Sequence, residues 1–334
     1  MKFSPLIRSP LQALAFFAGI TAAGQWNDPY PADEKGEAIY YSSFDERPKY
    51  LDPARSYSSD AYRFIAQIYE PVVQYHYLKR PFKLIPLTAT RVPTYQNRDK
   101  DGNALPMDAP ASQVATSVWT VQIQKGIKYQ NHPCFAKGAD GKLLYHHVTE
   151  AKMKGINNLF QLPETGTREL TAADYVYQIK RMADNRNSCP IFTVVIGKYI
   201  LGMKKYNVAV QTEIQRIRHE REVTAKRSGI LFFNHEEDEK KNPILIDYAS
   251  IPCPGLKLID DHTFEIVLIK KYPQFKYWLA MPFFAPMPWE AVHFYSQGPM
   301  AERNINLNWY PVGTGAYRMA VYDPNYRVVL VENE

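Results

Sequence analysis

The feature that most limits the fold is the stretch LKLIDDHTFEIVL at residues 256–268. Two runs of alternating apolar and polar residues meet at Asp260-Asp261, and aspartate is favoured in turns. In the second run, Phe264, Ile266 and Leu268 recur with the period of two that places them on one face of a strand. The pattern predicts a β-hairpin with one apolar face.

Further strands are expected on both sides of this hairpin. Residues 38–44 are rich in strand-forming types and predict a first strand. The stretch SVWTVQIQKGIKYQ at 117–130 alternates, with Trp119, Val121 and Ile123 on one face. Residues 316–331, AYRMAVYDPNYRVVLV, predict a strand, a turn and a strand.

Helical spacing appears in two stretches. Residues 58–69 repeat apolar side chains every three or four positions, with Ser59 as the expected N-cap, and Pro71 limits the helix. In ELTAADYVYQIKRMAD at 169–184, Thr171 and Asp174 form a capping box. A charged stretch from about 205 to 250 predicts a solvated helix and a surface loop. Strands and helices therefore alternate along the chain.

The segment NWYPVGTGAYRM at 308–319 raises the question of phosphate binding. A dinucleotide fingerprint requires a third glycine where Arg318 stands, and the residues that follow read as a strand rather than a helix. Phosphate binding is therefore not expected. Gly313 and Gly315 instead predict a tight turn with unusual dihedral angles.

Two groups of residues resemble metal sites. NRDKDGNALPMD at 97–108 has oxygen-bearing residues at several calcium-loop positions, but it begins with Asn97 and ends with Asp108 rather than glutamate. A solvated loop between strands is favoured over calcium binding. The histidines His146, His147 and His235 lack zinc spacing and are expected at the surface. No nucleophile elbow or other catalytic set appears, and neither a metal nor a cofactor is predicted.

The N-terminus resembles an export signal. Lys2 and Arg8 precede a short apolar run at 11–20, and small residues follow at 22–24. The run is too short to span a membrane, and no cysteine follows it for a lipid anchor. A cleaved signal peptide at 1–24 is favoured over a buried N-terminal helix, which predicts a periplasmic protein.

The net charge bears on nucleic-acid binding, and the cysteine content bears on disulfide formation. The formal net charge is +6, of which Lys2 and Arg8 supply two, so the body is too weakly basic to predict nucleic-acid binding. Cys134, Cys189 and Cys253 make an odd count. In an oxidising compartment one pair could form a disulfide, or all three could stay reduced, and the sequence does not choose among the pairings.

Several segments resemble, in order, one family of transport proteins, the extracellular solute-binding proteins of family 5. They are the peptide-, nickel- and oligopeptide-binding components of ABC importers. The matching segments are YLDPARS (50–56), IYEPVVQYHYLKRPFKLIPLTA (68–89), VWTVQIQKGIKYQNHPC (118–134), LTAADYVYQIKRM (170–182), DDHTFEIVLIKKYPQFKYWLA (260–280), PVGTGAYRM (311–319) and VVLVEN (328–333). Ala316 replaces the family's usual proline, and the charged stretch looks like an insertion.

The resemblance implies an α/β fold with lobes of the type II periplasmic-binding-protein kind, each a mixed sheet flanked by helices, and an extra domain within the first lobe. It divides the chain into a signal peptide (1–24), a first segment of lobe I (25–57), an inserted domain (58–255) and a return to lobe I (256–334). The matched motifs belong to the family's N-terminal half. The second lobe, with the residue that holds a peptide's amino terminus, is therefore expected to be missing.

The implied function is capture of a peptide, or of another small solute, and its delivery to an inner-membrane ABC permease complex. The protein is expected to be a monomer and not an enzyme. In such peptide binders the ligand backbone pairs with an exposed strand edge, which points to Tyr41, Ser42, Ser43 and Phe44 as ligand-binding residues. The alternatives are a secreted hydrolase and a non-functional fragment of a binding protein.

Overall fold

The structure, a computed structural model, describes residues 38–44, 46–323 and 326–333, and the chain divides into two units at residues 45 and 46. In the first unit, residues 38–44 adopt no regular secondary structure, so the strand predicted there is wrong. Strand formers make a strand only where a neighbouring segment supplies a hydrogen-bond ladder. No such ladder forms over these seven described residues. The expected signal peptide at 1–24 lies outside the described residues.

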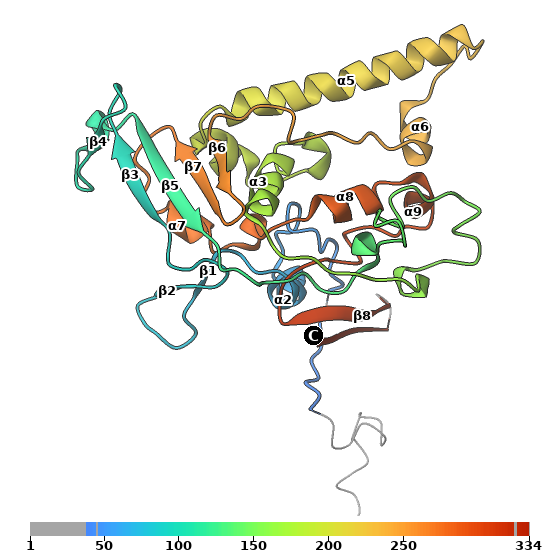
Figure 1. Cartoon of the computed structure of the whole chain (residues 1–334), viewed down its shortest axis with the longest axis horizontal. Coiled ribbons are helices and arrows are strands. Elements are labelled where there is room, and N and C mark those ends of the chain that lie inside the picture. Colours follow the sequence, from blue (N-terminus) through green and yellow to red (C-terminus); the bar gives the residue numbers. More distant parts are fainter. Residues whose placement is uncertain (1–37, 45, 324–325, 334) are drawn as a thin grey trace, which may run out of the picture. The chain divides into compact units, whose positions relative to one another are not determined.

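The second unit is built around a five-stranded sheet with the strand order β4-β3-β5-β7-β6 (Figure 1). Its strands are β3 (Thr94–Arg98), β4 (Ala104–Leu105), β5 (Thr116–Gln122), β6 (Leu256–Asp260) and β7 (Thr263–Leu268). The predicted hairpin at 256–268 is confirmed as β6 and β7. All four pairings in this sheet are antiparallel. The expected α/β architecture is present, but this sheet is not of mixed direction.

One face of the sheet carries the core. Trp119 lies opposite Ile266, and Val121 lies opposite Phe264, so that these four side chains share a face and are almost fully buried. Helix α3 (Ala172–Arg181) contacts β6 and β7, and helix α7 (Phe275–Trp278) lies beneath β5. The rings of Tyr175 and Phe264 stack 5.4 Å apart, and those of Trp119 and Phe275 lie 5.6 Å apart. Both helices therefore cover the apolar face that the alternation predicts.

The same sheet joins residues on both sides of the division expected at 255 and 256. Strand β5, from the expected inserted domain, pairs with β7, from the expected return to lobe I. The unit that starts at Glu46 also includes residues 46–57, which the resemblance places in lobe I. The division of the chain at 57 and 255 remains a prediction.

The remaining elements surround this sheet. The helices are α2 (Ser59–Ile68), α4 (Gly197–Tyr199), α5 (Met203–Arg227), α6 (His235–Lys241), α8 (Trp289–Tyr295) and α9 (Gly298–Glu302). Two antiparallel hairpins are formed by β1 (Val73–Tyr75) with β2 (Leu84–Pro86), and by β8 (Tyr317–Asp323) with β9 (Arg327–Glu332). Single 3₁₀ turns lie at Ala111–Gln113, Pro133–Phe135, Leu159–Gln161, Asn185–Asn187 and Pro282–Phe284, and a π turn at Phe192–Ile196. None of the described helices is long and apolar enough to cross a membrane.

Helix ends follow the local sequence closely. Ser58, rather than the expected Ser59, caps α2, since its side chain accepts a hydrogen bond from the Ala61 amide. The predicted capping box of α3 is confirmed: the Asp174 carboxylate accepts from the Thr171 amide at 3.0 Å. The solvated helix predicted in the charged stretch is confirmed as α5, but the surface loop predicted after it contains the short helix α6.

Residues 313–315, Gly-Thr-Gly, are named here the GTG segment. Its two glycines do not form the tight turn with unusual dihedral angles that the sequence predicts. Neither Gly313 nor Gly315 has a positive φ. Instead, a Cβ added at Gly313 would lie 1.9 Å from the Ile68 carbonyl oxygen, and one at Gly315 would lie 2.4 Å from that of Gln67. The Gly315 amide donates to the Ile68 carbonyl at 2.8 Å. Glycine is therefore required here because the backbone passes against the end of α2.

The segment that resembles a calcium loop is a hairpin connection between β3 and β4. Asn97 is a buried strand residue whose side chain accepts from the Ser117 hydroxyl at 2.8 Å. The Asp99 carboxylate accepts from the amides of Asp101 and Asn103, each at 2.9 Å. The turn itself thus occupies the oxygens that a cation would need, and the loop interpretation is confirmed.

One further prediction changes, and one alternative that the sequence left open is decided. His146 was expected at the surface but is buried, because it packs between Trp289 and His293. All three cysteines are free, and burial raises the pKa of the Cys189 thiol to about 11.

Candidate ligand-binding site

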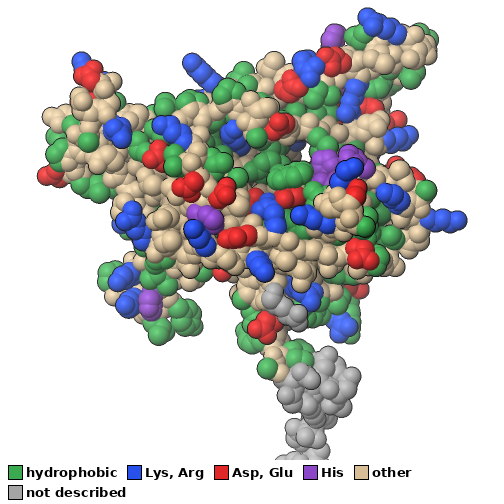
Figure 2. Space-filling view, viewed as in Figure 1, with side chains coloured by type: hydrophobic (Ala, Val, Ile, Leu, Met, Phe, Trp, Pro, Cys, Tyr) green, Lys and Arg blue, Asp and Glu red, His purple; other side chains and the backbone are tan. Residues whose placement is uncertain are grey.

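A cavity of about 1350 Å³ lies in the second unit, between α3, α8 and the charged stretch formed by α5, α6 and residues 243–249. Figure 2 shows the molecule hollowed below α5, with apolar side chains inside and histidine side chains at its edge. The volume exceeds that of an ordinary small-molecule pocket. Figure 1 shows α5 running above α3 and α8, with α6 beside α9.

Two buried charges that line the cavity form an ion pair. Arg181, in the last turn of α3, donates two hydrogen bonds to the two carboxylate oxygens of Asp52, at 2.8 and 2.5 Å, and both side chains are buried. Burial alone would raise the pKa of Asp52, but the Arg181 guanidinium outweighs it and holds that pKa below its usual range. Both charges are therefore fully committed to each other, and a ligand would gain little by displacing one.

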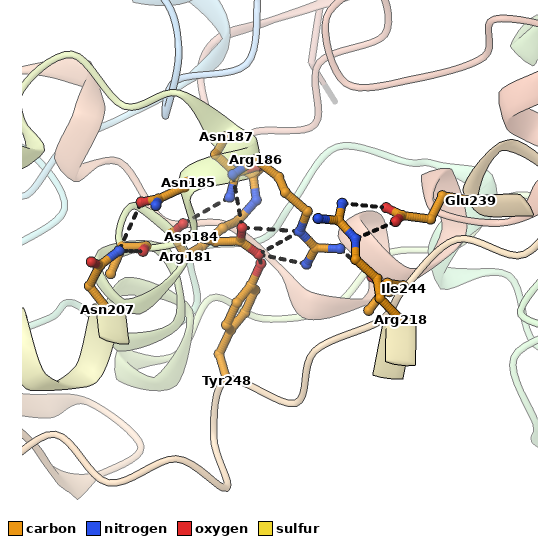
Figure 3. Close-up of polar contacts among 11 residues, drawn as sticks. Arg181, Asp184, Asn185, Arg186, Asn187, Asn207, Arg218, Glu239, Ile244 and Tyr248 are labelled. Atoms are coloured by element: carbon orange, nitrogen blue, oxygen red, sulfur yellow. Dashed lines mark hydrogen bonds and ion pairs between the residues drawn. The ribbon is translucent and has the colours of Figure 1, made fainter. Parts of the chain in front are cut away.

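A second cluster lies at the end of α3 (Figure 3). The Asp184 carboxylate accepts from Arg186 at 2.6 Å and from the Tyr248 hydroxyl at 2.7 Å, and Arg186 also donates to the Ile244 carbonyl at 2.8 Å. Burial raises the pKa of Asp184, but Arg186 and Tyr248 together lower it more, and the carboxylate stays charged. These contacts fasten residues 244–248 to α3 and so shape one wall of the cavity.

The wall contributed by the charged stretch is held by its own ion pairs. Arg218 of α5 meets Glu239 of α6 at 2.6 Å, as Figure 3 shows, and Arg221 meets Asp238 at 2.8 Å. These ion pairs therefore join the two helices of the predicted insertion. The insertion contacts the rest of the protein where α6 packs against α9.

Lys180 differs from these paired groups. Its ammonium donates to the carbonyls of Tyr248 and Ile251, each at 2.9 Å, and of Ala249 at 3.4 Å, and no ion pair is recorded for it among the described residues. Burial lowers the pKa of Lys180. It lines the cavity as a cation that faces carbonyl dipoles and the Tyr206 ring, whose centre is 5.4 Å from the ammonium.

Aromatic side chains of α8 form another wall of the cavity. Trp289 and His293 of α8 line the cavity, and the His293 ring stacks on His146 at 4.5 Å. Burial lowers the pKa of His293, so the ring is neutral at pH 7, and its Nδ1 is buried without a hydrogen-bond partner. No cluster of three metal-ligating side chains occurs in the described ranges. The cavity combines apolar and aromatic surfaces, satisfied ion pairs and a few open polar atoms, which suits reversible binding.

The residues predicted from sequence and the residues of the cavity are different sets. Tyr41, Ser42, Ser43 and Phe44 belong to the first unit, form no strand edge there and remain a prediction. The cavity residues were missed because they are contributed by segments far apart in the chain. One sequence signal could have pointed to the cavity. Lys180 and Arg181 place two cations in the last turn of a helix whose apolar side chains pack in the core.

Comparisons with known proteins place this geometry in context. Residues 111–334 match the family described as bacterial extracellular solute-binding proteins, family 5 Middle. The periplasmic oligopeptide-binding protein OppA of Salmonella typhimurium is 35% identical over 79 residues, which are 24% of this chain and 13% of OppA.

Solved structures with a similar course of the chain include two binding proteins. The murein tripeptide-binding protein MppA of Escherichia coli is 17% identical with a TM-score of 0.47, and the match covers 87% of this chain and 37% of that one. The substrate-binding domain of an oligopeptide ABC transporter from Bacillus anthracis is 14% identical with a TM-score of 0.49, over 88% and 37%. The chain thus spans little more than a third of these structures and 13% of OppA. Because the family match extends over most of its length, the chain belongs to the bacterial extracellular solute-binding proteins of family 5.

Proposed function

We propose that the chain is the solute-binding component of an ABC importer, and that it captures peptides and delivers them to a membrane permease. The observation that carries this proposal is the match of residues 111–334 to family 5. Peptides are the favoured solute because OppA and MppA are named for binding oligopeptides and a murein tripeptide. Capture of this kind requires no catalytic group.

The cavity supports a peptide as the ligand. Tyr177 and Trp289 offer aromatic faces, which contact side chains of many shapes. Because the ion pairs of the walls are already satisfied, a ligand does not have to neutralise them. The three donors of Lys180 are taken by backbone carbonyls, so it would attract the carboxylate end of a short peptide through its charge alone.

Three further parts of the proposal come from the sequence. Residues 1–24 would direct export to the periplasm, and the protein would act there as a monomer. Tyr41, Ser42, Ser43 and Phe44 would pair with the peptide backbone once a ligand orders them into a strand edge.

A thermal-shift screen tests the proposed function. The chain is heated with peptides of two to five residues, and with free amino acids, sugars and Ni²⁺ as other solute classes. Stabilisation by peptides that grows with concentration is expected, because a ligand of the folded state adds RT ln(1 + [L]/Kd) to the free energy of unfolding. A shift with sugars or Ni²⁺ alone would refute peptide capture, and no shift with any solute would refute a solute-binding role for this chain.

A further inference from the structure

The connection between β1 and β2 is a loop of unusual composition. It reads HYLKRPFK at residues 76–83 and is named here the basic hairpin loop. Tyr77 is 88% exposed, Leu78 is 76% exposed and Phe82 is 67% exposed. Large apolar side chains are rarely presented to water this fully in one short loop, and such groups mark contact surfaces.

The charge around the basic hairpin loop has one sign. A shallow cavity of about 550 Å³ beside it is lined by Lys79, Arg80, Lys83 and Lys276, and no carboxylate belongs to its lining. No ion pair is recorded for these four cations among the described residues. Figure 2 shows the hairpin as a projection with blue and green side chains and no red ones. The surface is therefore complementary to an anionic partner.

Ring contacts hold the loop in shape. The Tyr75 ring stacks on Tyr277 at 6.3 Å and meets the edge of Phe82 at 6.0 Å. The Arg80 guanidinium lies 4.7 Å from the Phe82 ring centre and donates to the Tyr77 and Lys79 carbonyls. These contacts order the base of the loop and leave Tyr77 and Leu78 at its tip, so little conformational entropy remains to be lost on binding.

We propose that the basic hairpin loop docks the protein on an anionic phospholipid bilayer. Tyrosine, phenylalanine and leucine beside lysine and arginine are the residue types that enter the bilayer interface while their cations meet lipid phosphates. A protein partner is the weaker explanation, because one hairpin tip offers much less area than a stable protein interface of about 800 Å² per partner requires. This role is independent of solute capture and places the protein beside the membrane.

Vesicle flotation of the full chain tests the proposal. Two variants are compared with the unchanged protein: Tyr77→Ser with Leu78→Ser, and Lys79→Gln with Arg80→Gln and Lys83→Gln. Binding to vesicles of phosphatidylglycerol and phosphatidylcholine is expected at low salt, with at least about tenfold weaker partitioning for each variant. Binding should also weaken at about 0.5 M NaCl, because salt screens the lysine and arginine charges.

The control is a second exposed apolar pair. Leu231 and Phe232, between α5 and α6, are 96% and 83% exposed, but the acidic first turn of α6 follows them. Leu231→Ser with Phe232→Ser should leave vesicle binding unchanged. All variants share residues 1–37, so the comparison isolates the loop, and unchanged thermal unfolding confirms that each one folds. Failure to bind anionic vesicles would overturn the proposal, as would equal binding to vesicles of pure phosphatidylcholine or equal loss in the control.

Discussion

At the scale of single residues, the GTG segment shows how a familiar pattern can have an unfamiliar cause. The glycines resemble a phosphate loop, yet their backbone lies against the last turn of α2 and leaves no space for a Cβ. The Gln130 amide also donates to the Gly313 carbonyl at 3.0 Å, which fixes the segment from its other side. Gly313 therefore reports a close contact between distant segments rather than a turn.

Gly313→Ala should strongly destabilise the fold. The new methyl group would meet the Ile68 carbonyl at 1.9 Å, and backbone atoms on both sides would have to shift. We expect a loss of about 3 kcal/mol or more in the free energy of unfolding, measured by urea denaturation. Gly126→Ala is the control: its Cβ has open space, and only its positive φ is penalised, by about 1 kcal/mol. Equal effects of the two substitutions would refute the close-contact explanation.

His132 makes the stability depend on pH. Its Nδ1 accepts from the Cys134 amide at 3.0 Å, so Nε2 carries the proton and donates to the Tyr295 hydroxyl at 2.8 Å. Burial lowers the pKa of His132 to about 3. Unfolded histidine titrates near 6.5, so the unfolded state binds an extra proton below that pH. The stabilising effect of neutral His132 is thus complete above about pH 6.5 and declines as the pH falls.

This pH dependence can be measured through His132→Gln. Urea unfolding of the unchanged protein between pH 7 and pH 4.5 should show stability decreasing, with His132 contributing up to about 1.4 kcal/mol per pH unit. The variant should be less stable at pH 7, but its stability should fall less steeply. His146, whose pKa burial lowers to about 4, remains in both proteins and adds the same slope to each. Identical slopes would contradict the account, because they would mean that His132 titrates alike in the folded and unfolded states.

At the scale of elements, Arg168 joins two helices. It forms two hydrogen bonds with Asp174 in the first turn of α3, at 2.7 and 2.8 Å, and two with Glu290 in the first turn of α8, at 2.6 and 2.7 Å. Burial raises the pKa of Asp174 in spite of this partner. One cation therefore serves two poorly solvated carboxylates and sets the distance between the helices that flank the cavity.

Arg168→Ala should cost about 3 to 5 kcal/mol of stability, because it leaves two carboxylates buried without a counter-charge. Arg216→Ala is the matched control, since Arg216 also contacts two glutamates, Glu213 and Glu220, but on the exposed surface of α5. Its loss should cost less than about 1 kcal/mol. Urea denaturation at pH 7 measures both. A comparable loss in the two variants would mean that Arg168 does not hold the helices together.

The elements also show what sequence patterns can predict. The hairpin at 256–268 and the helix from Ala172 were predictable because their signals, alternation and a capping box, lie within a few adjacent residues. The partners of Arg168 were not, because Glu290 lies 122 positions away. Asp52 and Arg181, which are 129 positions apart, escape a local pattern for the same reason. The strand expected at 38–44 fails in the opposite way, since its residue types are suitable but no strand of the described residues pairs with it.

At the scale of the whole molecule, family membership and the cavity together favour the binding of a peptide inside the second unit. The chain has the α/β architecture expected of its family, and its charged stretch closes a cavity of about 1350 Å³ against α3 and α8. The resemblance pointed to Tyr41 through Phe44, whereas the structure adds a site whose walls come from residues 52–55, 173–187, 218 and 235–308. The central claim is that this cavity holds the captured peptide.

Calorimetric titration with a peptide that stabilises the chain tests this claim most directly. Trp289→Ala removes an aromatic face from the cavity, and Tyr62→Ala removes an exposed ring of α2 that does not line it. The account predicts that Trp289→Ala raises the Kd at least about tenfold, a loss of roughly 1.4 kcal/mol, while Tyr62→Ala leaves it unchanged. An unchanged Kd in a folded Trp289→Ala variant would contradict the account and place the peptide elsewhere.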